Sequence, residues 1–493
     1  MKRLFIFLMF GVVAFDAFAQ TEEENGDDAA VNQYGVPVDS YPLKAEAQNE
    51  IMVLFNNEKG YKFWMDNRIQ FDGAHYFNLK NGMLVDGKPT MAGGVSLRRV
   101  RMAVKAEVHK NWYGEVDVNF ANGIFELEDA YIMFTGLKGF EFRAGNFKED
   151  FSMDQTTTSR YITFMERPMV VSTFAPSRHA GLQANWIQRS WIRASAGVSW
   201  QIVDTEDTRY NVTEFNKKGR NMGTNFTGKV VLMPWGADEF KGLHIGYNGS
   251  YRHAQKTDDD RDGADATGRG YEGNYFSTRN TTAINRLKFI STEYYGVKYD
   301  WLQGFELAGY KDGFRFQSEF ITNHSVMDGK KIDLYQKRDE NGKRLYDFDG
   351  PVANKETKYF YGFYAQASYL FFGGKQRYDV TQSEFTQPKR GKDWGDIELM
   401  FRYDFLTLNS QDLYGGSGEN FALGVVYHIN NNLKMSLNWQ YSRNDKYAGN
   451  KGKAMIGKDS DGNYTSYTTG PNAAVSDFGV KFHAFQTRLE IAF

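Results

Sequence analysis

The sequence predicts an all-β protein, a transmembrane antiparallel β-barrel of sixteen strands with an infolded constriction loop. Three observations predict this fold class. Apolar and polar residues alternate with a period of two in many segments. Aromatic residues make up 16% of the 493 residues although the mean hydropathy is −0.58. Short and long connections also alternate along the chain. A high share of aromatic residues together with a low mean hydropathy arises when one face of each strand meets lipid and the other meets water.

The first 19 residues are typical of a signal peptide. Lys2 and Arg3 precede an apolar run over residues 4–15, and Ala17-Phe18-Ala19 supplies a cleavage site. The run is too short for a membrane anchor, and Asp16 follows it. Removing the segment leaves 57 basic and 60 acidic residues, so the mature chain carries a formal charge of −3. No later stretch reaches about 18 apolar residues. We therefore expect an exported chain without a transmembrane helix.

Residues 20–60 form a separate region before the predicted barrel, which covers residues 61–493. The region opens with an acidic run over residues 22–28, and we expect a polar periplasmic leader. Residues 45–55 are compatible with a short helix.

From Tyr61 onwards the sequence alternates in segments of roughly ten or more residues. Val100, Met102 and Val104 lie on one face of such a segment, whereas Arg101 and Lys105 lie on the other. The predicted strands are 62–77, 95–109, 111–121, 124–136, 138–148, 178–188, 190–203, 222–235, 240–256, 284–302, 304–323, 355–373, 393–409, 419–431, 432–446 and 474–493.

The connections between these strands test the prediction independently. In a single-chain barrel, tight periplasmic turns alternate with longer external loops. Tight turns are predicted around His109-Lys110, Leu137, Gln188-Arg189-Ser190, Pro234–Asp238, Gln303 and Asn430–Asn432. Long loops are predicted at 149–177, 204–221, 257–283, 324–354 and 447–473. Two connections depart from the alternation: Asn122-Gly123 is short for a loop, and 374–392 is long for a turn.

The composition excludes several kinds of site. The chain has no Cys, so it has no disulfide, thiolate metal site or cysteine nucleophile. Its net charge of −2 gives no electrostatic basis for binding nucleic acid. The eight His show no zinc spacing, and no nucleophile elbow is present. Residues 258–263 resemble the start of a calcium loop, but Arg269 replaces the required Glu, which leaves at most a weak surface site. We expect no cofactor, resident metal or catalytic residue.

The chain ends on Phe493 within an alternating strand, where most second residues are apolar. This pattern resembles the last strand of outer-membrane barrels that are handled by the barrel-assembly machinery. A core strand that happens to end in Phe is the alternative interpretation.

Several short segments between Tyr61 and Gly181 together resemble the phosphate-selective porin O and P family. Their order and spacing over about 120 residues carry the resemblance. They are Asp66-Asn67-Arg68-Ile69-Gln70, Leu97-Arg98-Arg99-Val100-Arg101, Trp112-Tyr113-Gly114, Leu127-Glu128-Asp129-Ala130-Tyr131-Ile132, Arg143-Ala144-Gly145-Asn146-Phe147, Thr158-Ser159-Arg160-Tyr161-Ile162-Thr163-Phe164-Met165-Glu166-Arg167-Pro168 and Phe174-Ala175-Pro176.

The resemblance implies a homotrimeric porin in the outer membrane of a Gram-negative bacterium. It also implies a loop folded into the lumen, and basic residues at the constriction that bind small anions such as phosphate or polyphosphate. Arginine suits this task because its planar fork gives paired, charge-assisted hydrogen bonds to phosphate. The candidate constriction residues are Arg68, Arg98, Arg99, Arg101, Lys105, Arg143, Arg160 and Arg167.

Strand parity places Arg68, Arg99 and Arg101 in the lumen, whereas Arg98 has the parity of the lipid face. Arg98 therefore requires a bulge, a position at the rim, or a different strand assignment. Segment 149–177 is the candidate infolded loop, since an outward loop has no need of Phe164, Met165, Val170, Val171 and Phe174.

Three alternatives stay open. The arginines could pair with acidic residues such as Glu115, Asp117, Glu126 or Glu128 and merely satisfy the inner wall. Asn146 stands where relatives often carry a basic residue, which is compatible with a general porin that lacks phosphate selectivity. A barrel enzyme or an adhesin is the third alternative.

Overall fold

A computed structural model gives the positions of most of the chain, in two compact units, Met1–Lys44 and Ala45–Phe493. It describes residues 33–34, 38, 40–48, 51–80, 84–85, 88–89, 91–200, 223–235, 238–253, 255–256, 272–282, 284–285, 287–337, 340, 353–445, 447–448, 455–458, 464–466 and 479–493. The predicted signal peptide and the segment that resembles a calcium loop, 258–269, lie outside these residues. Among the helices of the described residues, none is both long and apolar enough to cross a membrane.

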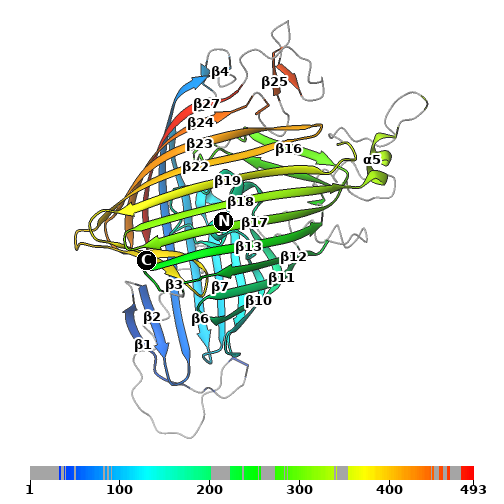
Figure 1. Cartoon of the computed structure of the whole chain (residues 1–493). Coiled ribbons are helices and arrows are strands. Elements are labelled where there is room, and N and C mark those ends of the chain that lie inside the picture. The colour runs from blue at the N-terminus through cyan, green and yellow to red at the C-terminus, as the bar shows by residue number, and fades with distance from the viewer. Residues whose placement is uncertain are drawn as a thin grey trace. The chain divides into compact units, whose positions relative to one another are not determined.

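Sixteen antiparallel strands form a closed ring in the second unit (Figure 1), as the sequence predicts. Each strand pairs with the next along the ring, and the last pairs with the first. In ring order they are β3 (Tyr61–Lys80), β6 (Gly94–Val108), β7 (Trp112–Asn119), β8 (Glu126–Phe134), β9 (Phe140–Lys148), β10 (Arg178–Arg189), β11 (Ile192–Ser199), β12 (Asn225–Leu232), β13 (Lys241–His253), β17 (Val297–Lys311), β18 (Phe314–Met327), β19 (Lys358–Leu370), β22 (Asp396–Ser410), β23 (Leu413–His428), β24 (Leu433–Asn444) and β27 (Lys481–Ala492).

The ring closes between β27 and β3, where Ile491 faces Ile69. Phe493 extends the pairing, because its backbone exchanges two hydrogen bonds with Asn67, of 2.7 and 3.1 Å. Beyond that point a hairpin of β1 (Lys44–Gln48) and β2 (Ile51–Asn56) takes the place of β27 beside β3. The helix considered for residues 45–55 is therefore wrong: β-branched and aromatic residues here extend the wall as strands.

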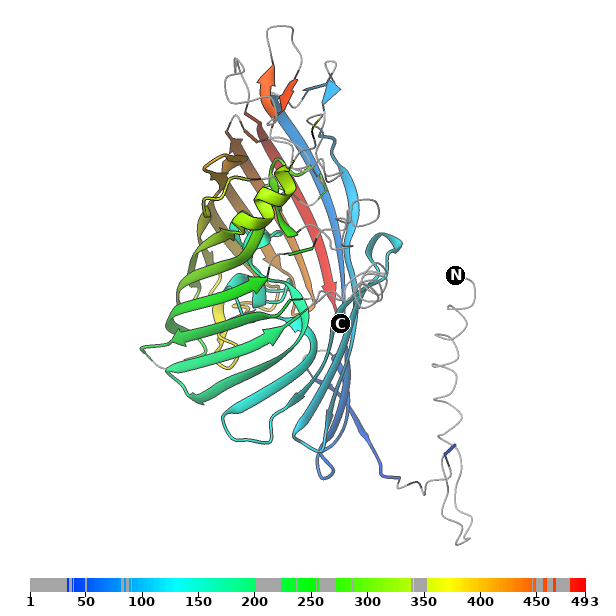
Figure 2. The ribbon, with the colours of Figure 1, turned by 90° about the vertical axis from the view of Figure 1, so that its right-hand side faces the viewer.

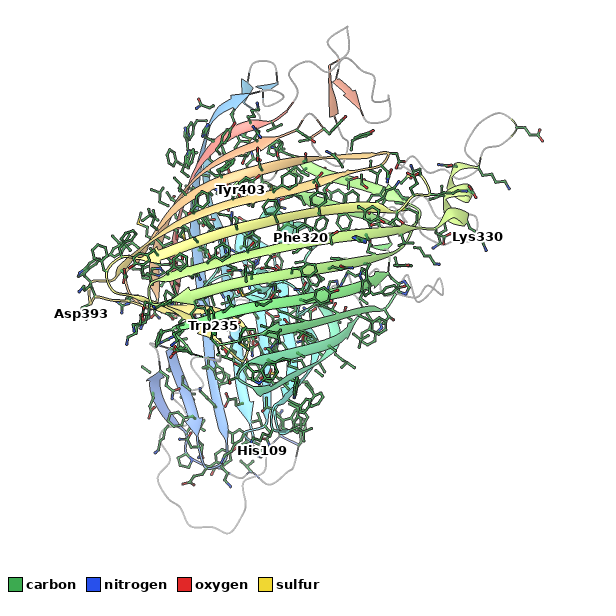
Figure 3. The ribbon with its side chains drawn as sticks, in the orientation of Figure 1. His109, Trp235, Phe320, Lys330, Asp393 and Tyr403 are labelled. Atoms are coloured by element: carbon green, nitrogen blue, oxygen red, sulfur yellow. The ribbon has the colours of Figure 1, made fainter. Side chains whose placement is uncertain are left out.

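Side chains alternate between the two faces of the wall, as the period of two requires. Along β19, buried and exposed residues follow each other almost strictly. The exposed set is rich in aromatic residues, among them Phe320. Figure 3 shows Phe320 and the half-buried Tyr403 on the wall. His109 and Asp393 lie at turns, and Lys330 lies at the other end of the strands from Asp393. We call the end with short turns and Phe493 the turn end, and the opposite end the loop end.

Two predicted connections lie elsewhere in the structure. The turn expected at Gln303 is formed by Asp312 and Gly313, so β17 and β18 lie further along the chain than predicted. Asp312 has a φ of 50°, which is a left-handed conformation. Asp tolerates this conformation in turns. The predicted strands 393–409 and 419–431 leave a connection at 410–418, but the structure has a tight turn at Gln411 and Asp412, between β22 and β23.

The segment 149–177 folds into the ring, as predicted, and carries the short helices α2 (Met153–Thr156) and α3 (Met169–Phe174) (Figure 2). Met169, Val170 and Val171 are fully buried. They join an apolar cluster with inward-facing residues of β17, β18, β19 and β22. Gly362 on β19 permits this approach, since an added Cβ would lie 3.0 Å from Val170. That part of the inner wall therefore faces packed protein rather than water, contrary to the expected polar inner face.

Two further segments fold inward. A three-stranded sheet of β14 (Gln255–Lys256), β15 (Glu272–Thr278) and β16 (Ile290–Tyr295) leads to Asn280 and Thr281, which bond to Asn444 and Gln440 on β24. At the turn end, a hairpin of β20 (Lys375–Asp379) and β21 (Glu384–Lys389) buries Tyr378 and Phe385 against Tyr310. This hairpin accounts for the unexpectedly long turn 374–392.

The remaining described elements are small. They are β4 (Leu84–Val85), β5 (Lys88–Pro89), the 3-10 turn η2 (Ala121–Gly123), α5 (Gly329–Gln336), β25 (Met455–Lys458) and β26 (Tyr464–Ser466).

Candidate functional site

The β3–β6 pair brings two adjacent arginines to the lumen side of one strand. Gln70 pairs with Arg99, but the next residue, Phe71, pairs with Leu97, so Arg98 is the extra residue of a β-bulge. A bulge shifts the side-chain alternation by one residue. Arg98 therefore reaches the loop residue Glu166 inside the ring, although its parity alone assigns it to lipid. Of the three explanations open from the sequence, the bulge is the correct one.

Arg68 and Arg99 are the candidate residues that lack an acidic partner. Both are 6% exposed. Arg68 donates to the hydroxyl of Ser159 at 2.6 Å, and Arg99 donates to Gln70 Oε1 at 2.8 Å. Within the described part of the chain, no carboxylate oxygen lies within 4.0 Å of either guanidinium. Their positive charges are thus held by neutral hydrogen-bond acceptors, which leaves charge available to an anion.

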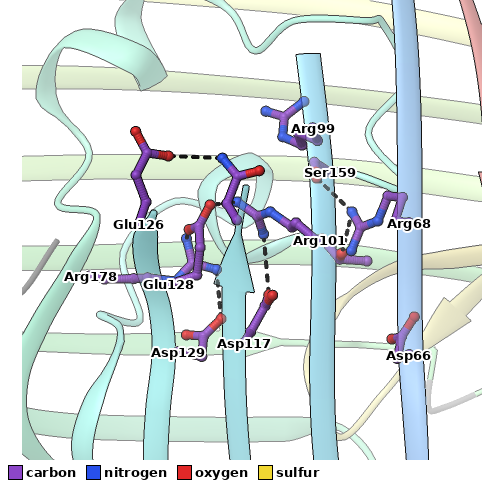
Figure 4. Close-up of polar contacts among 12 residues, drawn as sticks. Asp66, Arg68, Arg99, Arg101, Asp117, Glu126, Glu128, Asp129, Ser159 and Arg178 are labelled. Carbon is purple, nitrogen blue, oxygen red and sulfur yellow. Dashed lines mark hydrogen bonds and ion pairs between the residues drawn. The ribbon is translucent and has the colours of Figure 1, made fainter. Parts of the chain in front are cut away.

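The other wall candidates form ion pairs with neighbouring strands (Figure 4). Arg101 pairs with Asp117 at 3.4 Å and also with Glu128. Lys105 lies 3.1 Å from Asp66 and 3.6 Å from Glu115. Pairing of this kind matches the alternative in which wall arginines satisfy the barrel interior.

The remaining candidates are held through the infolded segments. Arg143 lies 3.5 Å from Glu141 and donates to Gln382 of the turn-end hairpin at 3.0 Å. Arg160 lies 3.4 Å from Asp66. Arg167 donates to backbone carbonyls at the end of α2, with distances of 2.9 Å to Asp154 and 2.6 Å to Thr157. A cation at a helix C-terminus is favourable, so Arg167 stabilises the shape of the loop.

Glu166 is the carboxylate of the infolded segment 149–177 that contacts Arg98. Arg98 binds it in a fork, with Nε–Oε1 at 2.8 Å and Nη2–Oε2 at 3.0 Å, and Arg488 of β27 adds a third contact at 3.1 Å. Burial alone raises the pKa of this carboxyl, but Arg98, Arg99 and Arg488 outweigh burial and hold the pKa of Glu166 well below its ordinary value. Glu166 is therefore ionised at neutral pH.

Three carboxylates, Glu115, Asp117 and Asp129, lie with one oxygen of each within 4.8 Å of the others. Each has a basic partner: Lys105, Arg101 and Arg178 respectively. The cluster therefore serves as the acidic half of an ion-pair network, and its geometry does not single out a metal site.

The candidate residues of β3 and β6 contribute to the lining of two cavities. The loop-side cavity, of about 400 Å³, is lined by five basic residues and one acidic residue. These are Arg98, Arg99, Arg167, Arg279, Lys288 and Glu166. The turn-side cavity, of about 410 Å³, has seven basic and six acidic residues in its lining. The basic residues of the turn-side cavity are Arg68, Arg101, Lys105, Arg143, Lys148, Arg178 and Arg193, and the acidic residues are Asp66, Glu115, Asp117, Asp129, Asp150 and Glu384.

This arrangement concentrates positive potential at the loop end and balances it at the turn end. Clefts lined by one sign of charge raise the local concentration of the opposite ion. The hydroxyls of Thr158 and Ser159 lie beside Arg68, where they can replace part of an anion's hydration shell.

The structure brings some of the wall candidates together and leaves others apart. The bulge brings Arg98 and Arg99 together, Arg68 and Arg101 face each other across β3 and β6, and Lys105 lies nearer the turn end. Arg143 lies further round the ring on β9. Sequence reasoning missed Arg402 and Arg488, which bind the backbone of the loop at Glu166 and Met165. Lumen parity on β22 and β27 is the signal that could have identified them.

Comparisons with known proteins give one family. The family model described as phosphate-selective porin O and P matches residues 65–466. Porin O of Pseudomonas aeruginosa is 22% identical over 477 residues, covering 89% of this chain and 93% of that protein. An uncharacterised protein of Caulobacter vibrioides is 20% identical over 351 residues, covering 70% of this chain and 62% of that protein.

Solved structures give more distant similarities. The outer membrane channel DcaP of Acinetobacter baumannii aligns with a TM-score of 0.46 at 8% identity, over 89% of this chain and 99% of that one. An anion-selective porin from Comamonas acidovorans aligns with a TM-score of 0.46 at 8% identity, over 88% of this chain and all of that one.

Proposed function

The chain belongs to the phosphate-selective porin O and P family, and we propose that it is a water-filled diffusion channel of the outer membrane for small anions such as phosphate or polyphosphate. The observation that carries this proposal is the pair Arg68 and Arg99. Both face the lumen at the constriction, and both lack a carboxylate within 4.0 Å in the described chain.

The route of an anion follows the charge distribution. The basic loop-side cavity collects anions from the loop end. At the constriction the anion meets Arg99 and then Arg68. The planar guanidinium of each can bind two phosphate oxygens at once. The near-balanced turn-side cavity no longer attracts the anion strongly, which favours its release. Conduction requires such weak and successive sites rather than one tight site.

The wider setting follows from the same family. We propose that residues 1–19 export the chain in a Gram-negative bacterium, and that residues 20–60 are a periplasmic region ahead of the barrel. Phe493 then guides insertion by the barrel-assembly machinery, the outer face meets outer-membrane lipid, and three copies assemble as a homotrimer. The protein acts as a channel rather than as an enzyme.

A general porin without phosphate selectivity is the second candidate. The observation that favours it is the turn-side cavity, whose seven basic and six acidic residues nearly cancel. The two candidates differ in one property: a phosphate-selective channel has a phosphate site that slows chloride, and a general porin does not.

Planar bilayer recordings test the proposal. In a KCl gradient, the wild-type channel is expected to prefer chloride, and added phosphate is expected to reduce the chloride current. Arg68→Gln and Arg99→Gln should each weaken this phosphate inhibition by about tenfold, the effect of losing about 1.4 kcal/mol of binding. Arg443→Gln is a matched control, because Arg443 is half exposed and pairs with Glu419 near the loop end.

Two results would contradict the proposal. A wild-type preference for potassium would exclude an anion channel. Chloride preference without phosphate inhibition would identify a general porin.

A further inference from the structure

The carboxylate of Glu166 occupies a position that an anion would be expected to take. Among the described residues that line the loop-side cavity, it is the one acidic group beside five basic ones. Arg98 holds both of its oxygens, at 2.8 and 3.0 Å, and Arg488 holds Oε1 at 3.1 Å. A forked arginine contact of this kind is also how proteins bind phosphate.

The backbone around Glu166 is fixed independently of its side chain. Arg402 donates to the carbonyl oxygen of Glu166 at 2.9 Å, and Arg488 donates to that of Met165 at 2.6 Å. The side chain of Glu166 is 15% exposed and that of Arg98 is 24% exposed. The carboxylate can therefore move away from Arg98 into the cavity without displacing the loop.

Arg98 and Arg488 differ in the carboxylate partners that they retain when Glu166 moves. Arg488 retains a second forked pair with Asp72, with both distances at 2.7 Å. Arg98 has no other carboxylate within 4.0 Å in the described residues. Displacement of Glu166 thus leaves the guanidinium of Arg98, next to Arg99, without a carboxylate partner among the described residues.

We propose that Glu166 is a tethered competitor that occupies the Arg98 site and is displaced by a passing oxyanion with two acidic oxygens, such as phosphate. This inference rests on the proposed function and adds a specificity-determining residue to it. The carboxylate is tethered, so it is always present at the site. Only an anion that offers Arg98 two acceptor oxygens, as the carboxylate does, displaces it. Chloride is monatomic and has no pair of oxygens for the guanidinium of Arg98, so it passes without displacing Glu166.

The consequence is weaker binding and faster release. Arg98 and Arg99 are adjacent, and an anion bound by both with no competitor would leave slowly. A channel conducts only when binding is weak enough to permit exit. Glu166 lowers the apparent affinity for phosphate by the free energy needed to displace it.

The variant Glu166→Gln tests the inference, because glutamine keeps the shape of the side chain and removes the charge. Phosphate inhibition of the chloride current should become about tenfold tighter, equivalent to about 1.4 kcal/mol. Glu419→Gln is the matched control: it also removes one carboxylate paired with an arginine, but Glu419 lies on the outward parity of β23 near the loop end. This control should leave the inhibition unchanged.

A second measurement separates competition from a structural role. Phosphate should raise the melting temperature of purified Glu166→Gln protein more than that of the wild type. If Glu166 only holds the loop in place, the variant instead loses anion preference and gains conductance, which overturns the inference. Unchanged or weaker phosphate inhibition in Glu166→Gln overturns it as well.

Arg98→Gln keeps the test valid if Glu166→Gln does not assemble. In that variant, phosphate inhibition should weaken severalfold, and unchanged inhibition would show that phosphate does not use the Arg98 site. Failure of the proposed function gives a different result, since wild-type chloride current would then be insensitive to phosphate.

Discussion

At the residue scale, the surroundings of each cation decide its role more than its identity does. Arg68 and Arg101 face each other across β3 and β6. Arg101 binds Asp117 and Glu128, whereas the side-chain partners of Arg68 among the described residues are the hydroxyls of Thr158 and Ser159. Removing Arg101 would leave the buried carboxylate of Asp117 without an ion-pair partner among the described residues, whereas Glu128 keeps Arg178. We therefore expect Arg101 to contribute to wall stability and Arg68 to keep its charge available to an anion.

Glu384 makes the turn-side cavity sensitive to pH. It lies on β21 of the turn-end hairpin, outside the sixteen wall strands. Burial, together with the nearby Asp379, raises the pKa of Glu384 to about 7 against the opposing effect of Lys148 and Lys229. The carboxyl is therefore mostly neutral at pH 6 and mostly ionised at pH 8.

Glu384 is one of the six acidic residues that line this cavity together with seven basic ones, and its ionisation adds one negative charge there. We expect the chloride-to-potassium permeability ratio to fall between pH 6 and pH 8, measured from reversal potentials in KCl. Chloride is the appropriate probe, because phosphate itself titrates in this range. Glu384→Gln should remove this change, and an unaltered pH dependence in that variant would contradict the assignment.

At the element scale, the infolded segment 149–177 is fixed at its start by buried ion pairs. Asp150 pairs with Arg193 at 2.6 Å, accepts a hydrogen bond from Ser195 at 2.7 Å and lies 3.6 Å from Lys229. The preceding Glu149 contacts Arg252 at 3.0 Å. These contacts fasten the segment to β11, β12 and β13. The next strands in the ring, which begin with β17, carry the apolar surface that receives α3.

Replacing Asp150 should loosen the segment. Asp150→Ala leaves Arg193 and Lys229 buried without this partner, a change that costs about 3–5 kcal/mol. We expect a lower unfolding temperature in detergent and a larger, less selective conductance. Ser195→Ala, which removes only one hydrogen bond, should cost about 1 kcal/mol. Equal effects of the two variants would argue against the anchoring role of Asp150.

At the scale of the whole molecule, closure of the ring removes every free strand edge from the barrel wall. The last strand completes this closure, and the backbone of Phe493 adds two hydrogen bonds to Asn67. The hairpin of β1 and β2 lies next to this seam and continues the pairing along β3.

Deleting Phe493 should impair assembly, because it removes these two bonds and the aromatic terminus. We expect less folded protein in the outer membrane, measured as the heat-modifiable band in electrophoresis. Phe493→Tyr keeps the backbone and the ring and should assemble normally. Normal assembly of the deletion variant would show that the terminal residue is dispensable.

The sequence by itself determined the number of strands, the side on which most side chains lie, and the infolding of residues 149–177. These features follow from local periodicity and from apolar residues that an external loop would not carry. The sequence also indicated that Arg98 needed an exceptional position, because its parity contradicted its charge.

Only the tertiary structure decided which cations are paired. The partners of Arg101 lie on β7 and β8. Glu166 of the infolded loop is the partner of Arg98 and one of the two partners of Arg488, whose other partner is Asp72 on β3. These contacts depend on strand register, on the bulge at Arg98 and on the path of the loop across the lumen. The turn at Asp312 and the inward hairpin of β20 and β21 depend on long-range packing in the same way. Periodicity fixes the face on which a residue lies, but the charge that it meets there is set by closure of the whole ring.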